Sequence, residues 1–504
     1  MDLLAARALA SPHRLALIWG QRAWTYQDLH THALALRQRL EQEGLKAGTR
    51  VAALLPKSPE AVLAFHAVVQ MGAVLVPLNL RLTDGEMASQ IQRSQATHVL
   101  TTASTAARAR RVAKGRPVVM VPRAPEHHAA PEAASFPTPP AAPTPEGLAP
   151  HAAHTPLAML FTSGTTGRAK AALLTLGNFY WSAIGSAFRL GVHPTDRWLL
   201  TLPLYHVGGL SILFRSALYG TTVVLPTNDA PFDPEGLYET LQTQRVTLVS
   251  LVPTMLYRLL QATTAPPPPH LRTVLLGGAA TPLPTLQAAQ ARGYPVALTY
   301  GLTEATSQVA TATPAEVRHK PGSVGHPLLF TRVRVVDDTG RPLPPGEIGE
   351  ITVQGPTVFA GYDDDPRATE AALSGGWLHT GDLGYLDHEG ALWVVNRRSD
   401  LIVTGGENVY PAEVEAVLRR HPAVADVCVV GLDDPEWGQR VAAAVVLRPH
   451  QQVTPAALED HCRRALAGYK IPRFIHIVPD LPRTASGKVQ RPQVRTLLEK
   501  ALHR

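Results

Sequence analysis

VAALLPKSPEAVLAFHAVVQMGAVLVP occupies residues 51–77 and places two strand-length apolar runs on either side of a helical pattern. The first run is Val51–Leu55, the helical pattern is Ser58–Met71, and the second run is Ala73–Pro77. Apolar runs of this length are typical of buried strands, whereas the longer pattern between them indicates a helix. The segment therefore predicts a β-α-β unit, the building block of parallel sheets covered by helices.

The same strand–helix–strand pattern recurs further along the chain and predicts a second β-α-β unit. An apolar run at Val246–Val252 is followed by a helical pattern at Pro253–Ala262 and by a second run at Leu271–Leu276. The bulk of the chain is therefore predicted to be α/β, with helix-covered mixed sheets in a large N-terminal domain that spans residues 1–398. We find no internal repeats, and about three folding units fit into 504 residues.

The pattern of apolar and charged residues changes after about Asn396. A helical pattern at Pro411–Arg420 and β-rich runs near Val427 and Val445 predict a small α+β domain over residues 399–504. Within the large domain, residues 122–156 are rich in alanine and proline and lack any period that could bury a face. We expect that segment to be a long surface loop.

Composition narrows the class of protein. The formal charge of +7 is modest and the bases are scattered, so we expect no nucleic-acid partner, although a mildly positive field favours polyanionic small molecules such as ATP and coenzyme A. Two cysteines, Cys428 and Cys462, cannot build a disulfide framework or a Cys-rich zinc site. We interpret both as buried apolar residues. With no export signal and no apolar stretch of about 20 residues, we expect a cytoplasmic protein without membrane insertion.

The most informative segment is LAMLFTSGTTGRAK at residues 157–170, where a strand-length run breaks into hydroxyls and glycines. Such a loop can cradle an anion through its hydroxyls and exposed backbone N–H groups. Its spacing is not that of a Walker A loop. Taken alone it could equally be a loop without a ligand.

This loop resembles the phosphate loop of the adenylate-forming superfamily, which contains acyl-CoA synthetases, luciferases and peptide-synthetase adenylation domains. Ala169 and Ala171 stand where that loop usually has proline and glycine. Five further segments resemble the superfamily's signatures in the same order: LLGGAATP at 275–282, TYGLTEATSQ at 299–308, GWLHTGDLG at 376–384, NRRSDLIVTGGENVYPAEVE at 396–415 and LPRTASGKVQR at 481–491. The resemblance implies a large N-terminal domain, a small mobile C-terminal domain, and adenylation of a carboxylic acid by ATP.

The resemblance also implies roles for single residues. Tyr300 would stack on adenine, Thr303 would hydrogen-bond the α-phosphate, Glu304 would bind Mg²⁺, and Asp382 would accept hydrogen bonds from the ribose hydroxyls; each side chain suits that chemistry. A Thr-Glu pair taken alone is more often a helix start. The nucleotide would be bound by Thr162, Ser163, Gly164, Thr165, Thr166, Lys170, Gly277, Gly278, Ala279, Tyr300, Gly301, Asp382, Arg397 and Gly406.

Two half-reactions are implied for this site. In the first, Lys488 matches the superfamily's catalytic lysine and would stabilise charge as the acid attacks ATP. In the second, the small domain would rotate about the Ser399 region and bring the Gly405–Gly406 loop to the thiol of coenzyme A. The catalytic residues would then be Lys488, Thr303, Glu304 and His206.

The acid is suggested by PLYHVGGLSILFR at residues 203–215, which resembles the branch of the superfamily that joins o-succinylbenzoate to coenzyme A in menaquinone biosynthesis. Arg215 lies on an apolar helical stretch and would pair with a second carboxylate of the substrate, although an internal acid is the alternative partner. Ser307 and Gln308 would suit a polar aromatic acid, with His206 between the acyl pocket and the thiol. Other acids (fatty, malonyl or aryl), loading of a carrier protein, and the oligomeric state remain open.

Overall fold

The structure is a computed structural model that describes residues 2–124, 153–162, 169–227, 232–397, 401–482 and 489–502. The β-α-β unit predicted from residues 51–77 is present, because β3 (Arg50–Leu54) pairs in parallel with β4 (Val74–Pro77) around α3 (Pro59–Met71). Ser58 caps the N-terminus of α3 with its side chain, and Gly72 ends the helix in the left-handed conformation at φ 69°.

The largest sheet of the large domain is parallel through its middle strands. The predicted β-α-β unit at residues 246–276 lies here, since β11 (Leu248–Leu251) and β12 (Thr273–Leu276) pair in parallel and α9 (Pro253–Ala262) connects them. Antiparallel strands close both ends of the sheet. Its order is β15 (His326–Pro327), β14 (Ser307–Ala312), β13 (Val296–Leu302), β12 (Thr273–Leu276), β11 (Leu248–Leu251), β9 (Arg197–Leu199), β10 (Thr222–Leu225), β1 (Leu15–Trp19) and β2 (Arg22–Thr25).

Two further sheets complete the large domain. One is mixed and runs in the order β18 (Gly361–Tyr362), β8 (Lys170–Thr175), β7 (Pro156–Thr162), β4, β3, β5 (His98–Thr101) and β6 (Val118–Met120). The other is antiparallel and contains β16 (Arg332–Val336), β17 (Gly349–Gln354), β20 (Trp377–Leu386), β19 (Leu373–Ser374) and, beside β20, β21 (Leu392–Arg397). The prediction of helix-covered mixed sheets is therefore confirmed.

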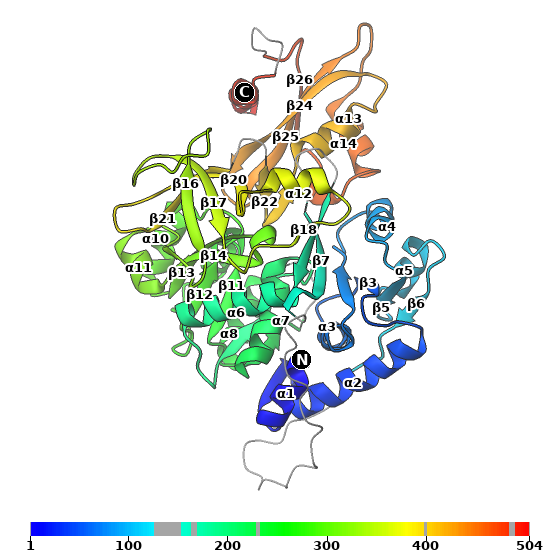
Figure 1. Ribbon diagram of the computed structural model, residues 1–504. Coiled ribbons are helices and arrows are strands. Elements are labelled where there is room, and N and C mark those ends of the chain that lie inside the picture. The colour runs from blue at the N-terminus through cyan, green and yellow to red at the C-terminus, as the bar shows by residue number, and fades with distance from the viewer. Residues whose placement is uncertain are drawn as a thin grey trace.

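Helices cover these sheets (Figure 1), and among the described residues the buried apolar side chains of this domain form three clusters. The helices of the large domain are α1 (Leu3–Ala10), α2 (Tyr26–Gln42), α3, α4 (Asp84–Arg93), α5 (Ala106–Val112), α6 (Leu176–Leu190), α7 (Val207–Tyr219), α8 (Pro234–Thr243), α9 (Pro253–Ala262), α10 (Leu283–Ala291), α11 (Pro314–His319) and α12 (Pro366–Ala372), with a short 3-10 helix η2 at Thr303–Ala305. In the described part of the chain, none of the helices combines the length and hydrophobicity that a membrane span requires.

The C-terminal residues form a small domain with a sheet of its own, drawn in orange and red in Figure 1. Its strands are β23 (Glu407–Val409), β22 (Ile402–Thr404), β25 (Gly438–Leu447), β24 (Val424–Asp434) and, parallel to β25, β26 (Phe474–Ile477). Its helices are α13 (Pro411–Leu418), α14 (Pro455–Arg463), α15 (Arg491–Leu502) and the 3-10 helix η3 (Gly468–Lys470). Both cysteines are buried in this domain, as expected.

Two predictions on segment boundaries fall largely outside the described residues. The proposed boundary at 398/399 and the hinge at Ser399 lie within residues 398–400, and most of the Ala/Pro-rich segment at 122–156 lies within residues 125–152. Both stay predictions.

Candidate active site

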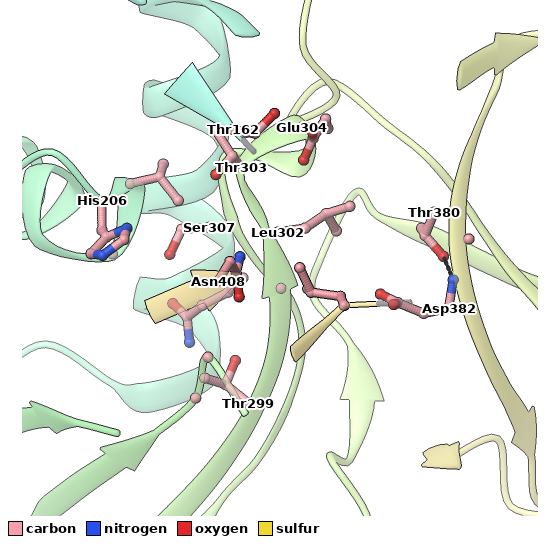
Figure 2. Close-up of a pocket in the computed structure, with 18 of the residues that line it drawn as sticks. Thr162, His206, Thr299, Leu302, Thr303, Glu304, Ser307, Thr380, Asp382 and Asn408 are labelled. Atoms are coloured by element: carbon pink, nitrogen blue, oxygen red, sulfur yellow. Dashed lines mark hydrogen bonds between the residues drawn. The ribbon is translucent and has the colours of Figure 1, made fainter. Parts of the chain in front are cut away.

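A cavity of about 650 Å³ lies where the sheets of the large domain meet the small domain. Its wall takes residues from strands β7, β8, β11, β12, β13, β14 and β20, from helix α7, and from the small domain at Gly406 and Asn408. Segments that are far apart in the sequence therefore contribute to one pocket. In Figure 2, His206 and Ser307 lie on one side of the pocket, Thr380 and Asp382 on the other, and Leu302 between them.

One region of the pocket carries hydroxyls and a carboxylate. Thr162 ends β7, and Thr303 and Glu304 begin η2 directly after β13, so all three lie in the same part of the pocket (Figure 2). Lys170 also lines the pocket. The Thr-Glu pair is thus both a helix start and part of the wall. The other predicted loop residues, Ser163, Gly164, Thr165 and Thr166, lie outside the described part of the chain.

Tyr362 orients the Glu304 carboxylate and was missed by the sequence analysis. Its hydroxyl donates a hydrogen bond to Glu304 Oε1 at 2.8 Å, and Lys170 Nζ lies 5.0 Å from the centre of its ring. Burial and the neighbouring Glu304 charge raise the pKa of Tyr362, so this hydroxyl remains a donor. A lone carboxylate held beside hydroxyls fits Mg²⁺, which takes one or two protein carboxylates and completes its shell with phosphate and water. The position of Glu304 in this structure therefore fits its predicted role as a metal ligand.

The backbone between β13 and β14 is irregular at the centre of the site. The register shifts between Tyr300 and Gly301, and Thr306 and Ser307 have positive φ values of 51° and 88°. Ser182 Oγ holds the turn by donating to the Thr306 carbonyl oxygen at 2.7 Å. Positive φ in residues other than glycine is costly and persists where the surrounding structure enforces it. The turn presents Gly301, Ser307 and Gln308 to the pocket.

We expect Gly301→Ala to disrupt this turn, because a Cβ on residue 301 would occupy the position of the Ser307 carbonyl oxygen. The expected loss of stability is about 2–4 kcal/mol, since backbone cannot move aside as a flexible side chain can. Thermal unfolding measures it. Gly85→Ala in α4 is the matched control, because nothing lies within 4 Å of its added Cβ and alanine favours helix, so stability should rise by about 1 kcal/mol. Equal melting temperatures for wild type and Gly301→Ala would contradict this account.

The opposite side of the pocket carries Asp382, whose side chain is buried on β20. The Tyr300 hydroxyl donates to Asp382 Oδ2 at 2.6 Å, so the two predicted nucleotide contacts touch each other. Thr380 Oγ1 accepts from the Asp382 backbone N–H at 3.1 Å.

Gly277 and Gly278 line the pocket and Ala279 follows in the same loop. Arg397 pairs with Asp382 through the strand backbone, and its side chain is outside the described part.

Arg215 is the most unusual side chain in the wall. It is only 2% exposed, its Nη2 donates to Ser182 Oγ at 3.2 Å, and its Nε has no hydrogen-bond acceptor. Among the described residues no carboxylate lies within ion-pair distance of it, so they contain no internal partner of the kind considered above. Burial lowers the pKa of Arg215, although the neighbouring Tyr219 acts in the opposite direction. A buried cation in a cavity wall without an anionic partner calls for a ligand.

Gln308 adds a second unsatisfied polar atom to the same pocket. Its Nε2 donates to Thr311 Oγ1 at 2.9 Å, but its buried Oε1 has no partner. Ser307 lines the pocket beside it. The predicted substrate residues Arg215, Ser307 and Gln308 are therefore brought together, with His206 also in the wall.

Glu407 of β23 brings the small domain to His206. His206 Nε2 lies 3.2 Å from Glu407 Oε2, and the Tyr205 hydroxyl and Arg81 guanidinium donate to Oε1 at 3.0 and 3.2 Å. Burial would raise the pKa of Glu407, but His206, Arg81 and Tyr205 outweigh it and lower the pKa to about 2. The sequence analysis missed Glu407, whose one signal was its place beside the predicted Gly405–Gly406 loop. Gly406 itself lies against the Val252 side chain.

Two further predicted functional residues cannot be compared with the geometry. Lys488 and Ser399 both lie outside the described part of the chain.

A pocket with this wall, between a three-sheet domain and a small domain, matches a known class. The chain belongs to the AMP-binding enzyme family: the family model described as AMP-binding enzyme matches residues 4–363, and the one described as AMP-binding enzyme C-terminal domain matches residues 413–488. The predicted superfamily is thereby confirmed.

Within the family, the chain is similar to ligases that are named for one acid, 2-succinylbenzoate. It is 40% identical over 499 residues to the 2-succinylbenzoate–CoA ligase of Geobacillus kaustophilus, covering 99% of this chain and 98% of that one. Two solved structures of o-succinylbenzoate CoA synthetase from Bacillus subtilis are each 38% identical, with 98% of both chains covered. The TM-score is 0.88 with a double mutant bound to the product analogue OSB-NCoA, and 0.70 with the complex of the acyl-adenylate intermediate OSB-AMP.

Proposed function

We propose that this protein is a cytoplasmic, ATP-dependent acid–thiol ligase that converts 2-succinylbenzoate to 2-succinylbenzoyl-CoA in menaquinone biosynthesis. Its relatives over the whole chain carry the name of that activity. The observation that carries the proposal within this chain is the buried Arg215 guanidinium in the pocket wall, without an acidic partner among the described residues.

A substrate with two carboxylates accounts for that arginine. One carboxylate must reach the phosphate end of the pocket to be activated, and the other is free to pair with Arg215. A guanidinium and a carboxylate form paired, charge-assisted hydrogen bonds that are strong where water is excluded. A fatty acid or a simple benzoic acid would leave Arg215 without that anion, at the cost of an unpaired buried charge.

In the first half-reaction the substrate carboxylate attacks the α-phosphorus of ATP and pyrophosphate leaves. We assign Thr303, Lys170, Lys488 and the hydroxyl loop from Thr162 to Thr166 to the phosphates, where hydroxyl and ammonium donors offset developing negative charge. Mg²⁺ on Glu304 would neutralise phosphate charge when bound. Tyr362 holds the Glu304 carboxylate in place through its hydroxyl.

The nucleoside would lie along the opposite wall. We assign Tyr300, Gly277, Gly278, Ala279 and Gly301 to the base and its surroundings, and Asp382 and Arg397 to the ribose. Asp382 already accepts one hydrogen bond from Tyr300, and its remaining lone pairs can accept from ribose hydroxyls.

In the second half-reaction coenzyme A attacks the acyl carbonyl carbon as its thiolate, and AMP leaves with the electrons of the broken acyl–phosphate bond. His206 lies in the wall beside the acyl side chains, and Glu407 and Gly406 of the small domain meet that wall. The two domains, residues 1–398 and 399–504, would thus be arranged for thiol entry, with the rotation between half-reactions pivoting near Ser399.

The test is a substrate panel with purified protein, ATP and Mg²⁺. We expect 2-succinylbenzoate to drive pyrophosphate release roughly 100-fold faster than benzoate or octanoate at equal concentration, because an acid without a second carboxylate leaves a buried charge unpaired, which typically costs about 2–5 kcal/mol. Addition of coenzyme A should then yield the thioester. Transfer to a carrier protein instead of coenzyme A would favour the alternative of a loading module, and the absence of pyrophosphate with every acid would refute the proposal.

A further inference from the structure

Lys470 is a lysine buried at the contact between the two domains. It ends η3 in the small domain, and its side chain is 7% exposed. Its Nζ lies 2.7 Å from Glu413 Oε1 of α13, in the same domain, and 2.7 Å from Glu86 Oε1 of α4, in the large domain. One ammonium group therefore joins a carboxylate from each side of the interface.

The large domain orients Glu86 by itself. At the start of α4, the Thr83 backbone N–H and hydroxyl donate to Glu86 Oε2 at 2.7 and 2.9 Å, and the Glu86 N–H donates back to Thr83 Oγ1. This capping box fixes one carboxylate oxygen and leaves the other, Oε1, directed at Lys470. The small domain thus meets a preformed acceptor and need not order a flexible side chain on docking.

Besides the contact between His206 and Glu407, which is ionic only when the histidine is protonated, three ion pairs cross the interface among the described residues, and Lys470–Glu86 is the most completely buried of them. The side-chain exposures are 7% and 16% for Lys470 and Glu86, 50% and 6% for Arg81 and Glu407, and 29% and 49% for Arg258 and Glu436. Water screens exposed pairs, so those contribute little, whereas a short contact that is shielded from water is screened less. Lys470–Glu86 is therefore expected to be the strongest ionic contact between the domains.

The chemistry of the contact favours reversible docking. Lys470 and Glu413 belong to the same domain and stay together when that domain moves, so only the link to Glu86 must break. After separation Lys470 keeps an anion, and Glu86 keeps its capping box, so neither domain is left with an unpaired buried charge. Two structures of one Bacillus subtilis relative, at equal identity and coverage, match this chain to different degrees: the TM-score is 0.88 with the product-analogue complex and 0.70 with the acyl-adenylate complex.

We propose that Glu86 is a positioning residue whose contact with Lys470, here called the Lys470 latch, holds the small domain docked for the thioester-forming half-reaction. The inference rests on the proposed function. The latch contacts neither the nucleotide side of the pocket nor Arg215, so it acts on the docked population and leaves the adenylation chemistry untouched. It brings Glu407 and Gly406 to the pocket by holding the domain that carries them.

Glu86→Gln tests the latch, because glutamine can replace glutamate in a capping box while removing the charge that meets Lys470. We expect thioester formation from preformed acyl-adenylate to slow by roughly tenfold, since a charge-assisted contact is replaced by a neutral one. The apparent KM for coenzyme A should rise, because fewer molecules are docked. Adenylation, measured as pyrophosphate release, should keep its wild-type rate.

A distance measurement gives a readout that does not depend on activity. Spin labels at the exposed positions Gln92 of α4 and Gln451 of the small domain report the separation of the two domains. We expect Glu86→Gln to lower the population of the distance that the docked arrangement gives. This measurement remains informative if no acid supports pyrophosphate release, in which case the proposed function fails and the latch is still tested.

Glu316→Gln is the matched control. Glu316 forms the same capping box, with Thr313 at the start of α11, and pairs with Arg189 at 2.5 Å, but all of these residues lie in the large domain. It should change neither half-reaction selectively nor the distance distribution. Unchanged thioester formation and unchanged distances in Glu86→Gln would refute the latch, and so would an equal slowing of both half-reactions, which indicates general destabilisation.

Discussion

Arg215→Met should remove most of the preference for 2-succinylbenzoate and leave the protein at least as stable as the wild type. The guanidinium is assigned to the second carboxylate of the substrate, and truncating one partner of a buried, hydrogen-bonded charge pair typically costs 2–5 kcal/mol. We therefore expect kcat/KM for 2-succinylbenzoate to fall by about 10²–10³-fold, with little change for benzoate. Steady-state pyrophosphate release with both acids measures the change in selectivity.

The expected stability follows from the contacts of the free site. The described residues give Arg215 one hydroxyl partner and no carboxylate, and its Nε has no acceptor, so replacement by an apolar side chain of similar length removes a buried charge. Ser182 keeps its hydrogen bond to the Thr306 carbonyl. A melting temperature equal to or above that of the wild type is expected.

Arg272→Met is the contrasting control. Arg272 lies away from the pocket and pairs with the buried carboxylate of Asp196 at 2.7 Å. Its loss leaves that carboxylate without a cation and should cost about 3–5 kcal/mol of stability without altering selectivity. An Arg215→Met variant that loses activity on benzoate and 2-succinylbenzoate by the same factor would contradict a role in substrate recognition.

Lys488→Ala should lower the rate of adenylation by about 10²–10³-fold, the usual effect of removing one group that stabilises developing charge. Thioester formation from preformed acyl-adenylate should survive close to the wild-type rate, because that step breaks the acyl–phosphate bond without pyrophosphate departure. Single-turnover measurements of each half-reaction, with the acyl-adenylate supplied for the second, separate the two rates.

Lys500→Ala is the control for Lys488→Ala, since Lys500 is an exposed lysine in the last turn of α15 in the same domain. It should change neither half-reaction. Equal losses of both half-reactions in Lys488→Ala would contradict the division of labour between the two steps.

The predictions from the sequence that held were those based on local pattern. The β-α-β units at residues 51–77 and 246–276 were visible because strand and helix leave different periods in the sequence, and parallel pairing follows from the crossover between them. The family was visible because its motifs keep their order along the chain. Both kinds of signal are carried by residues close together in sequence.

Contacts between distant segments could not be predicted in this way. Glu407 meets Tyr205 across 202 positions, and Lys470 meets Glu86 across 384, so no spacing relates them. Tyr362 was missed for the same reason, since its neighbour Glu304 lies 58 positions away. The positive φ values of Thr306 and Ser307 are imposed by tertiary contacts against local preference.

The two carboxylate oxygens of Glu86 make different contacts, one with the start of α4 and the other with Lys470. This limits which residues can replace Glu86 in evolution. Most replacements would damage the start of α4 together with the contact to Lys470. Glutamine separates the two contacts, and a single nucleotide change converts a glutamate codon to a glutamine codon. A single mutation can therefore weaken the Lys470 latch while the helix still begins at the same residue.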